Sequence, residues 1–121
     1  MQSERKASGR IDSEFGHAVL KKPAVGDFRV QPNLGGRLTA AAPPPVIRAF
    51  ADVVLRQLRW PVVFSRVDIV ANGFSPLLME LEVIEPELFL DLAPGSSQRL
   101  ASAIRAYLLQ VPSSQLAARN A

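Results

Sequence analysis

Hydrophobic and polar positions repeat with two different periods along the chain, and the changes of period divide it into elements. Apolar residues recur at helical spacings of three and four over residues 46–60, and again over 96–111. Short segments rich in apolar and β-branched residues, bounded by prolines and glycines, have the pattern of strands at 15–21, 27–31, 62–70 and 77–84. The pattern therefore predicts the order strand, strand, helix, strand, strand, helix.

This order predicts an α+β domain in which helices cover one face of an antiparallel sheet. Residues 1–14 are polar and show no period, so we expect a flexible leader there. Pro112 ends the last helical pattern, and we expect a frayed tail over residues 111–121. The folded domain is accordingly predicted to span residues 15–110.

The composition narrows the chemistry that the domain can perform. Hydrophobic residues make up 48% of the 121 residues, which is enough for a modest buried core. The absence of cysteine excludes disulfides, zinc–thiolate sites and thiol nucleophiles, and a single histidine, His17, excludes multi-histidine metal sites. A metal ion would have to be bound mostly by carboxylate oxygens, which favours a hard cation such as Mg²⁺ or Mn²⁺.

The charge of the chain is compatible with an anionic ligand, but it is weak evidence for nucleic-acid binding. The net charge is +3 and the pI is near 10.0, but the basic residues are scattered and no aromatic residues interleave with them in a stripe. The N-terminus has no apolar signal-peptide core, and no apolar run approaches the roughly 20 residues of a membrane span. We expect a cytoplasmic protein without a membrane partner.

Candidate chemistry is concentrated in the segment VVFSRVDIVANGFSPLLMELEVIEP, residues 62–86. Because side chains alternate between the faces of a strand, Arg66 and Asp68 share one face of the first strand, and Glu80 and Glu82 share one face of the second. Whether these two pairs meet depends on the register, since a slip of one residue moves every side chain to the other face.

Two turns are compatible with the sequence between these strands. A two-residue turn at Asn72-Gly73, which is a common hairpin signal, would leave Asp68 and Glu80 on opposite faces. A three-residue loop over residues 73–75 would set Asp68 across from Glu80, and Arg66 across from Glu82. We predict that an odd-length loop or a β-bulge brings the carboxylates together.

Three converging carboxylates repel one another unless cations neutralise them, and one arginine cannot balance all three. A divalent cation that also contacts substrate phosphates would complement them. The alternative is that Arg66 and Glu82 form a cross-strand ion pair while Asp68 is exposed to solvent. Spacing alone favours this alternative, because surface ion pairs are common.

The motifs in this region resemble those of ATP-grasp proteins, in particular the group of glutathione synthetases, cycloserine-biosynthesis ligases and ribosomal-protein glutamate ligases. The resemblance covers roughly residues 15–107 and rests on GDFRVQPNLGG, RVDIV and MELEVIEPELFLDLAP in this order. It implies the fold of the C-terminal ATP-grasp subdomain. It also implies an ATP-dependent carboxylate–amine ligase, in which ATP phosphorylates the carboxylate and the amine displaces phosphate from the acylphosphate.

The resemblance assigns roles to individual positions. It implies that Asp68, Glu80 and Glu82 hold Mg²⁺ ions that bridge ATP phosphates, with Glu82 standing where many relatives have asparagine. It implies a catalytic contact from Arg29 to the transferred phosphoryl group. It also implies a cofactor-binding segment near the phosphates made of Arg29, Gln31, Asn33, Gly35 and Gly36.

The same resemblance raises the question of what completes the site. ATP-grasp enzymes bind the nucleotide between two subdomains, and the first normally supplies a phosphate-binding lysine and the adenine contacts. Residues 1–14 are too short to build that subdomain, so we expect a truncated gene, a fragment, or one half of a split ligase whose N-terminal half would lie on another chain. Two hypotheses follow, a metal- and ATP-phosphate-binding half with little activity alone, or a non-catalytic interaction module that retains the half-fold. The carboxylate and amine substrates are not specified by this part of the sequence.

Overall fold

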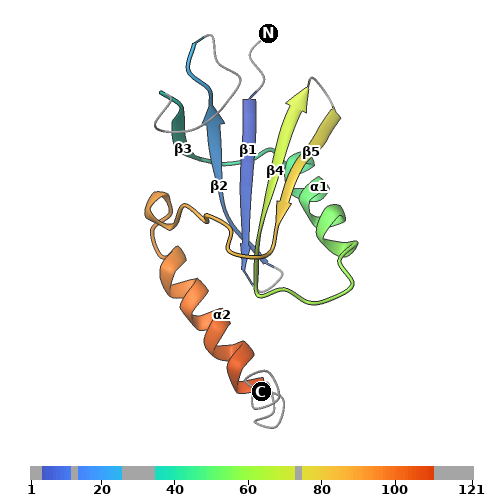
Figure 1. Ribbon diagram of the computed structural model, residues 1–121, viewed down its shortest axis with the longest axis vertical. Helices are drawn as coiled ribbons and strands as arrows, with labels where there is room; N and C mark the ends of the chain where they lie inside the picture. The colour runs from blue at the N-terminus through green and yellow to red at the C-terminus, as the bar shows by residue number, and fades with distance from the viewer. Residues whose placement is uncertain (1–3, 12–13, 26–34, 73–74, 111–121) are drawn as a thin grey trace.

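Five strands form a single antiparallel sheet (Figure 1). The computed structural model describes residues 4–11, 14–25, 35–72 and 75–110. Within these residues the strand order across the sheet is β3-β2-β1-β4-β5, and each neighbouring pair is antiparallel. The strands are β1 Glu4–Ile11, β2 Glu14–Lys22, β3 Arg37–Ala41, β4 Phe64–Asn72 and β5 Ser75–Glu82. The predicted α+β class with an antiparallel sheet is confirmed.

The central strand β1 corrects the prediction of a flexible leader over residues 1–14. Its residues pair along their whole length with β2 on one side and with β4 on the other. A strand in this position has its backbone N–H and C=O groups bonded by both neighbours, and this outweighs the weak strand pattern of ERKASGRI. The predicted strand at 27–31 and the predicted tail at 111–121 lie outside the described residues.

Helix α1, Pro45–Arg56, covers one face of the sheet and builds the main core. Pro45 occupies its first turn, where a missing N–H has no helical partner to lose. Ile47 and Ala51 are buried, and they pack against Val67 and Ile69 of β4. The face of β4 that carries Val67 and Ile69 is therefore apolar, and the alternate residues of β4 point to the opposite face.

The chain crosses that opposite face after β5 and then enters helix α2, Ser96–Gln110 (Figure 1). A 3₁₀ turn at Leu90–Leu92 precedes the helix, and the Ser96 hydroxyl donates a hydrogen bond to the Leu90 carbonyl oxygen at 3.0 Å. Only Ser96 and Ala103 of α2 are buried, and the helix runs away from the lower end of the sheet in Figure 1. No helix in the described residues has the length and apolar character needed to cross a membrane.

Candidate functional site

The register of β4 and β5 brings the predicted carboxylates together. Arg66 pairs with Glu82 and Asp68 pairs with Glu80, as the odd-loop or bulge hypothesis requires. The pairing of Asn72 with Ser75 would by itself put them out of register, and an irregularity between Asp68 and Ile69 restores it. A β-bulge of this kind adds one residue to one strand and re-aims the side chains beyond it. The prediction of a bulge is thus confirmed.

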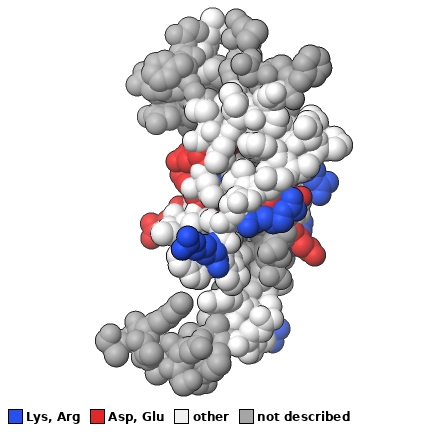
Figure 2. Space-filling model, turned by 90° about the vertical axis from the view of Figure 1, so that its right-hand side faces the viewer, with Lys and Arg blue, Asp and Glu red and all other residues white. Residues whose placement is uncertain are grey.

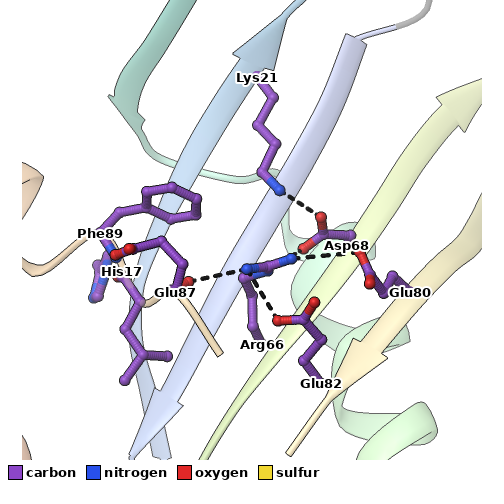
Figure 3. A network of polar contacts seen from close by, with 9 residues as sticks. His17, Lys21, Arg66, Asp68, Glu80, Glu82, Glu87 and Phe89 are labelled. Carbon is purple, nitrogen blue, oxygen red and sulfur yellow. Dashed lines mark hydrogen bonds and ion pairs between the residues drawn. The ribbon is translucent and has the colours of Figure 1, made fainter. Parts of the chain in front are cut away.

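Arg66 lies at the centre of the polar face and contacts all three carboxylates (Figure 3). Its Nε donates to Asp68 Oδ1 at 2.8 Å, its Nη1 lies 3.1 Å from Glu82 Oε2, and its Nη2 lies 3.4 Å from Glu80 Oε2. The Arg66 side chain is only 10% exposed. A guanidinium suits this position because its five N–H donors reach several acceptors from one planar group.

Asp68 is buried and has a second cationic partner, which comes from strand β2 on the same face of the sheet. Lys21 Nζ donates to Asp68 Oδ2 at 2.5 Å, and the two side chains are 11% and 10% exposed. Lys21 belongs to β2, so the contact spans the central strand β1. On β1 the residues paired with Asp68 and Arg66 are Ala7 and Gly9. The earlier alternative in which Asp68 is exposed to solvent is therefore wrong, while its Arg66–Glu82 ion pair is present.

Glu80 and Glu82 are the outer pair of the cluster and are more accessible to solvent. Their side chains are 53% and 30% exposed. The pKa of Glu82 is raised above its usual value because burial disfavours its charged form and because the neighbouring Glu80 adds a hydrogen bond and negative charge; Arg66 opposes this shift. With Lys21, the described side chains of the cluster carry two positive and three negative formal charges, so one negative charge is left over among them.

The segment after β5, residues 87–89, packs against the polar face beside the carboxylate cluster. Arg66 Nη1 donates to the Glu87 carbonyl oxygen at 3.2 Å, and His17 Nε2 lies 2.6 Å from the Leu88 carbonyl oxygen. The Phe89 ring lies over both cations, with its centroid 5.3 Å from Lys21 Nζ and 5.7 Å from Arg66 Cζ. These contacts hold three consecutive residues of the segment against the polar face.

Phe89 also has an unusual backbone conformation. Its φ is 51° and its ψ is 45°, in the left-handed region that non-glycine residues seldom adopt. The cost of this conformation is of order 1–3 kcal/mol, which the surrounding contacts must offset. Neither Phe89 nor Lys21 had a role in the sequence-based prediction. No local signal identifies them, since both reach the cluster from segments distant in sequence.

The other predicted ligand-binding residues are not gathered at the cluster by the described structure. Arg29, Gln31 and Asn33 lie outside the described residues. Gly35 and Gly36 precede β3, the edge strand opposite to β5. Gly35 has φ +78°, which favours glycine in this turn. Their predicted role in phosphate binding stays a prediction.

The fit of a metal ion depends on the donor atoms that the cluster offers. Within the described residues, no group of three or more His, Cys, Asp or Glu side chains has an arrangement that could hold a metal ion as it stands. Both oxygens of Asp68 already accept bonds from Arg66 and Lys21. Glu80 and Glu82 are only partly neutralised and partly exposed, and they are carboxylates of the kind that Mg²⁺ binds. As it stands, the described cluster is a network of ion pairs, and Glu80 and Glu82 are its carboxylates that solvent can reach.

Comparison with solved structures shows where this fold occurs elsewhere. No protein-family model matches the sequence, and a search of curated proteins gives no match. The crystal structure of a D-cycloserine synthetase superposes with a TM-score of 0.67 and 26% identity, covering 86% of this chain and 38% of that one. The chain has the fold of the C-terminal part of an ATP-grasp domain.

The same ATP-grasp fold is found in more distant ligases. A D-alanine–D-alanine ligase from Bacillus anthracis, solved in complex with ATP, matches with a TM-score of 0.63 and 14% identity over 86% of this chain and 39% of its own. A second structure of a ligase of this name from B. anthracis gives a TM-score of 0.60 at 13% identity. This chain thus spans less than two-fifths of the length of each relative, and the predicted resemblance to ATP-grasp ligases is confirmed.

Proposed function

We propose that this chain provides the metal- and phosphate-binding face of an ATP-grasp carboxylate–amine ligase. The observation that carries the proposal is the bulged register, which places Asp68, Glu80 and Glu82 on one face with a single negative charge left over. Folding alone gains nothing from two neighbouring carboxylates on this face, where burial, and after it the hydrogen bond and charge of Glu80, raise the pKa of Glu82. Such perturbed groups cluster at functional sites.

The cation that fits this face is Mg²⁺ or Mn²⁺. Glu80 and Glu82 supply oxygen donors that solvent can reach, and Asp68 anchors them through the guanidinium that all three share. Mg²⁺ is usually bound by one or two carboxylates together with substrate phosphates, which matches an outer pair rather than a closed cage. When bound, the ion would polarise ATP phosphates and offset their negative charge.

The chain's own residues would perform the remaining tasks at this face. Lys21 and Arg66 hold the carboxylates in place, and the Phe89 ring limits the access of water to both cations. The reaction we propose for the complete site is phosphorylation of a substrate carboxylate by ATP, followed by attack of an amine on the acylphosphate. Arg29 would contact the transferred phosphoryl group, and Gln31, Asn33, Gly35 and Gly36 would lie near the phosphates.

The length of the relatives bears on how such a site is completed. The D-cycloserine synthetase has a second portion of the polypeptide beyond the 38% that this chain matches. We therefore propose that an adenine-binding half, supplied in the same polypeptide or by another chain, completes the nucleotide site. The phosphate-facing half alone would bind Mg²⁺-ATP weakly and turn over slowly.

Isothermal titration with Mg²⁺-ATP tests the proposal. We expect saturable binding with a Kd on the order of 0.1–1 mM, weakened at least about fivefold by Glu82→Gln, a loss of roughly 1 kcal/mol. Glu14→Gln is the matched control, because it removes the same charge from a side chain that is 81% exposed and lies 3.7 Å from its arginine partner. Absence of binding up to 10 mM ATP, or equal effects of both variants, would overturn the proposal.

One observation favours a second function, that of a non-catalytic interaction module. Leu77, Leu78 and Met79 on the edge strand β5 are each about half exposed, as is Leu108 on α2, while Leu109 is 73% exposed. Apolar edge strands and helix faces of this kind are typical of surfaces that pair with another chain. Analytical ultracentrifugation distinguishes the two functions. Concentration-dependent association that Leu78→Lys abolishes, without any binding of Mg²⁺-ATP, would favour the interaction module.

A further inference from the structure

A second concave site lies on the other side of the sheet from the carboxylate cluster. Its volume is about 440 Å³, within the roughly 300–1,000 Å³ range of small-molecule sites. The end of α1, the following residues 58–62 and Ser65 of β4 enclose it. Ser65 shares the face of β4 that carries Val67 and Ile69, whereas Arg66 and Asp68 point to the opposite face. The two sites are therefore separated by the sheet.

Ser65 is a buried polar residue of this cavity. It is 1% exposed, and its hydroxyl has no hydrogen-bond partner among the residues that the structure describes. An unpaired buried hydroxyl costs about 1–3 kcal/mol, so a group of this kind calls for a ligand or another explanation. Arg56 and Arg59 also line the cavity, and in the part of the chain that the structure describes neither guanidinium makes a hydrogen bond or an ion pair.

The rim of the cavity carries the chain's only tryptophan. Trp60 is 74% exposed, although an indole of this size is usually largely buried. Exposed aromatic rings beside arginines are enriched where proteins bind ligands and partners. In Figure 2, which faces the side of the molecule where Figure 1 shows α1 and β5, the basic side chains form small separate patches rather than a stripe. This distribution suits a compact anion better than an extended polyanion.

The lining specifies the chemistry of the occupant. Two guanidinium groups at the rim would bind a phosphate or carboxylate group, and the Trp60 indole would stack on a planar ring. Ser65 at the floor would accept a hydrogen bond from the far end of that ring. The two arginines supply the positive charge for the acidic group of the ligand.

We propose that this cavity binds a small aromatic anion, with its acidic group at Arg56 and Arg59, its ring on Trp60 and a polar substituent toward Ser65. The site is independent of the ATP-phosphate face, because the residues of the two sites belong to opposite faces of β4. A ligase half with such a site would possess a second small-molecule ligand besides its nucleotide.

The indole N–H resonance of Trp60 reports directly on this site, because no other tryptophan is present. Two-dimensional ¹H–¹⁵N NMR of the full chain with 4-aminophenyl phosphate as the probe should show a saturable shift of this peak at millimolar or lower concentration. Inorganic phosphate alone and aniline alone should bind at least about tenfold more weakly, since each supplies only part of the contacts. Equal binding of inorganic phosphate, or a shift that never saturates, would overturn the proposal.

Substitutions distinguish binding of the probe at this cavity from a general effect of the protein's charge. Arg59→Gln should weaken binding of the probe at least about fivefold, because charge-assisted hydrogen bonds to the phosphate are lost. Arg105→Gln on α2 is the matched control, since it removes the same charge from an exposed residue remote in sequence from the cavity, and it should leave the Kd unchanged. Ser65→Ala should weaken binding by a factor of about two to five. If Arg105→Gln has the same effect as Arg59→Gln, the binding is not at this cavity and the proposal fails.

Discussion

Replacing Arg66 by methionine removes the one group that contacts every carboxylate of the cluster. Methionine has a similar length and keeps much of the apolar packing of the arginine stem, so the change chiefly deletes charge and hydrogen bonds. The guanidinium donates to Asp68 and to the Glu87 carbonyl oxygen, and it forms ion pairs with Glu80 and Glu82. We expect Arg66→Met to destabilise the fold substantially.

The magnitude follows from the burial of each partner. Asp68 is 10% exposed, and removal of one partner from a buried ion pair costs about 3–5 kcal/mol. Lys21 remains on the second oxygen of Asp68, which places the expected loss near the lower end of that range. The Glu80 side chain is 53% exposed, and its pairing with Arg66 adds little because solvent screens it. The expected loss in the free energy of unfolding is therefore about 3 kcal/mol.

Urea denaturation at pH 7, followed by circular dichroism, measures this loss. With an m-value of about 1.5–3 kcal/mol/M, the midpoint should fall by roughly 1–2 M. Arg99→Met is the control, because its side chain is 46% exposed and its ion pair with Glu14 is 3.7 Å long; we expect a loss below about 1 kcal/mol. A loss below about 1 kcal/mol for Arg66→Met would refute the reasoning that this arginine neutralises the cluster.

Three further substitutions test other parts of the account. The raised pKa of Glu82 means that the folded state binds a proton more tightly than the unfolded chain does. The free energy of unfolding should therefore fall as pH rises from about 4.5 through the folded pKa. Glu82→Gln should flatten this fall in urea titrations across pH 4–8. Glu85 is exposed with φ +53°, so Glu85→Gly should raise the free energy of unfolding by about 0.5–1 kcal/mol, and a loss would show that its side chain stabilises the turn. Ile69 is 0% exposed against α1, so Ile69→Ala should cost about 2–5 kcal/mol in thermal or urea unfolding, and a cost below 1 kcal/mol would contradict its place in the core.

The sequence was sufficient for most elements and for the register of the carboxylate strands. Side chains alternate strictly along a strand, so the requirement that Asp68 meet Glu80 left only an odd loop or a bulge. The structure contains the bulge, and β4 and β5 begin and end within two residues of the predicted bounds. The start of α1 follows equally directly from the prolines that precede the helical pattern, whereas the helix ends at Arg56, before the predicted end at Pro61.

Strand β1 could not be predicted in the same way. The segment ERKASGRI has no clear alternation of apolar and polar residues, and its pairing on both sides is determined by β2 and β4. Strand formation of this kind depends on neighbours that are distant along the chain rather than on local propensity. The missing strand also hid the role of Lys21, since its contact with Asp68 passes across β1.

The residues that surround the carboxylates could likewise not be predicted from local sequence patterns. Lys21 and Asp68 are 47 residues apart, and Phe89, whose ring lies over Lys21 and Arg66, has a left-handed backbone conformation that no local sequence signal predicts. Spacing alone suggested that an ion pair with an exposed Asp68 was the simpler interpretation. The structure combines the two hypotheses, because the Arg66–Glu82 pair exists and Asp68 is buried in the same network.

We propose that the outer carboxylates of this face bind a divalent cation. Titration of the ¹⁵N-labelled chain with Mn²⁺ tests this binding most directly, because the bound ion broadens the amide resonances of nearby residues. We predict selective broadening at Asp68, Glu80 and Glu82 at substoichiometric Mn²⁺, reversed by excess Mg²⁺ and lost in a Glu80→Gln, Glu82→Gln variant. Broadening that is uniform over the surface, or that persists unchanged in this variant, would contradict the account.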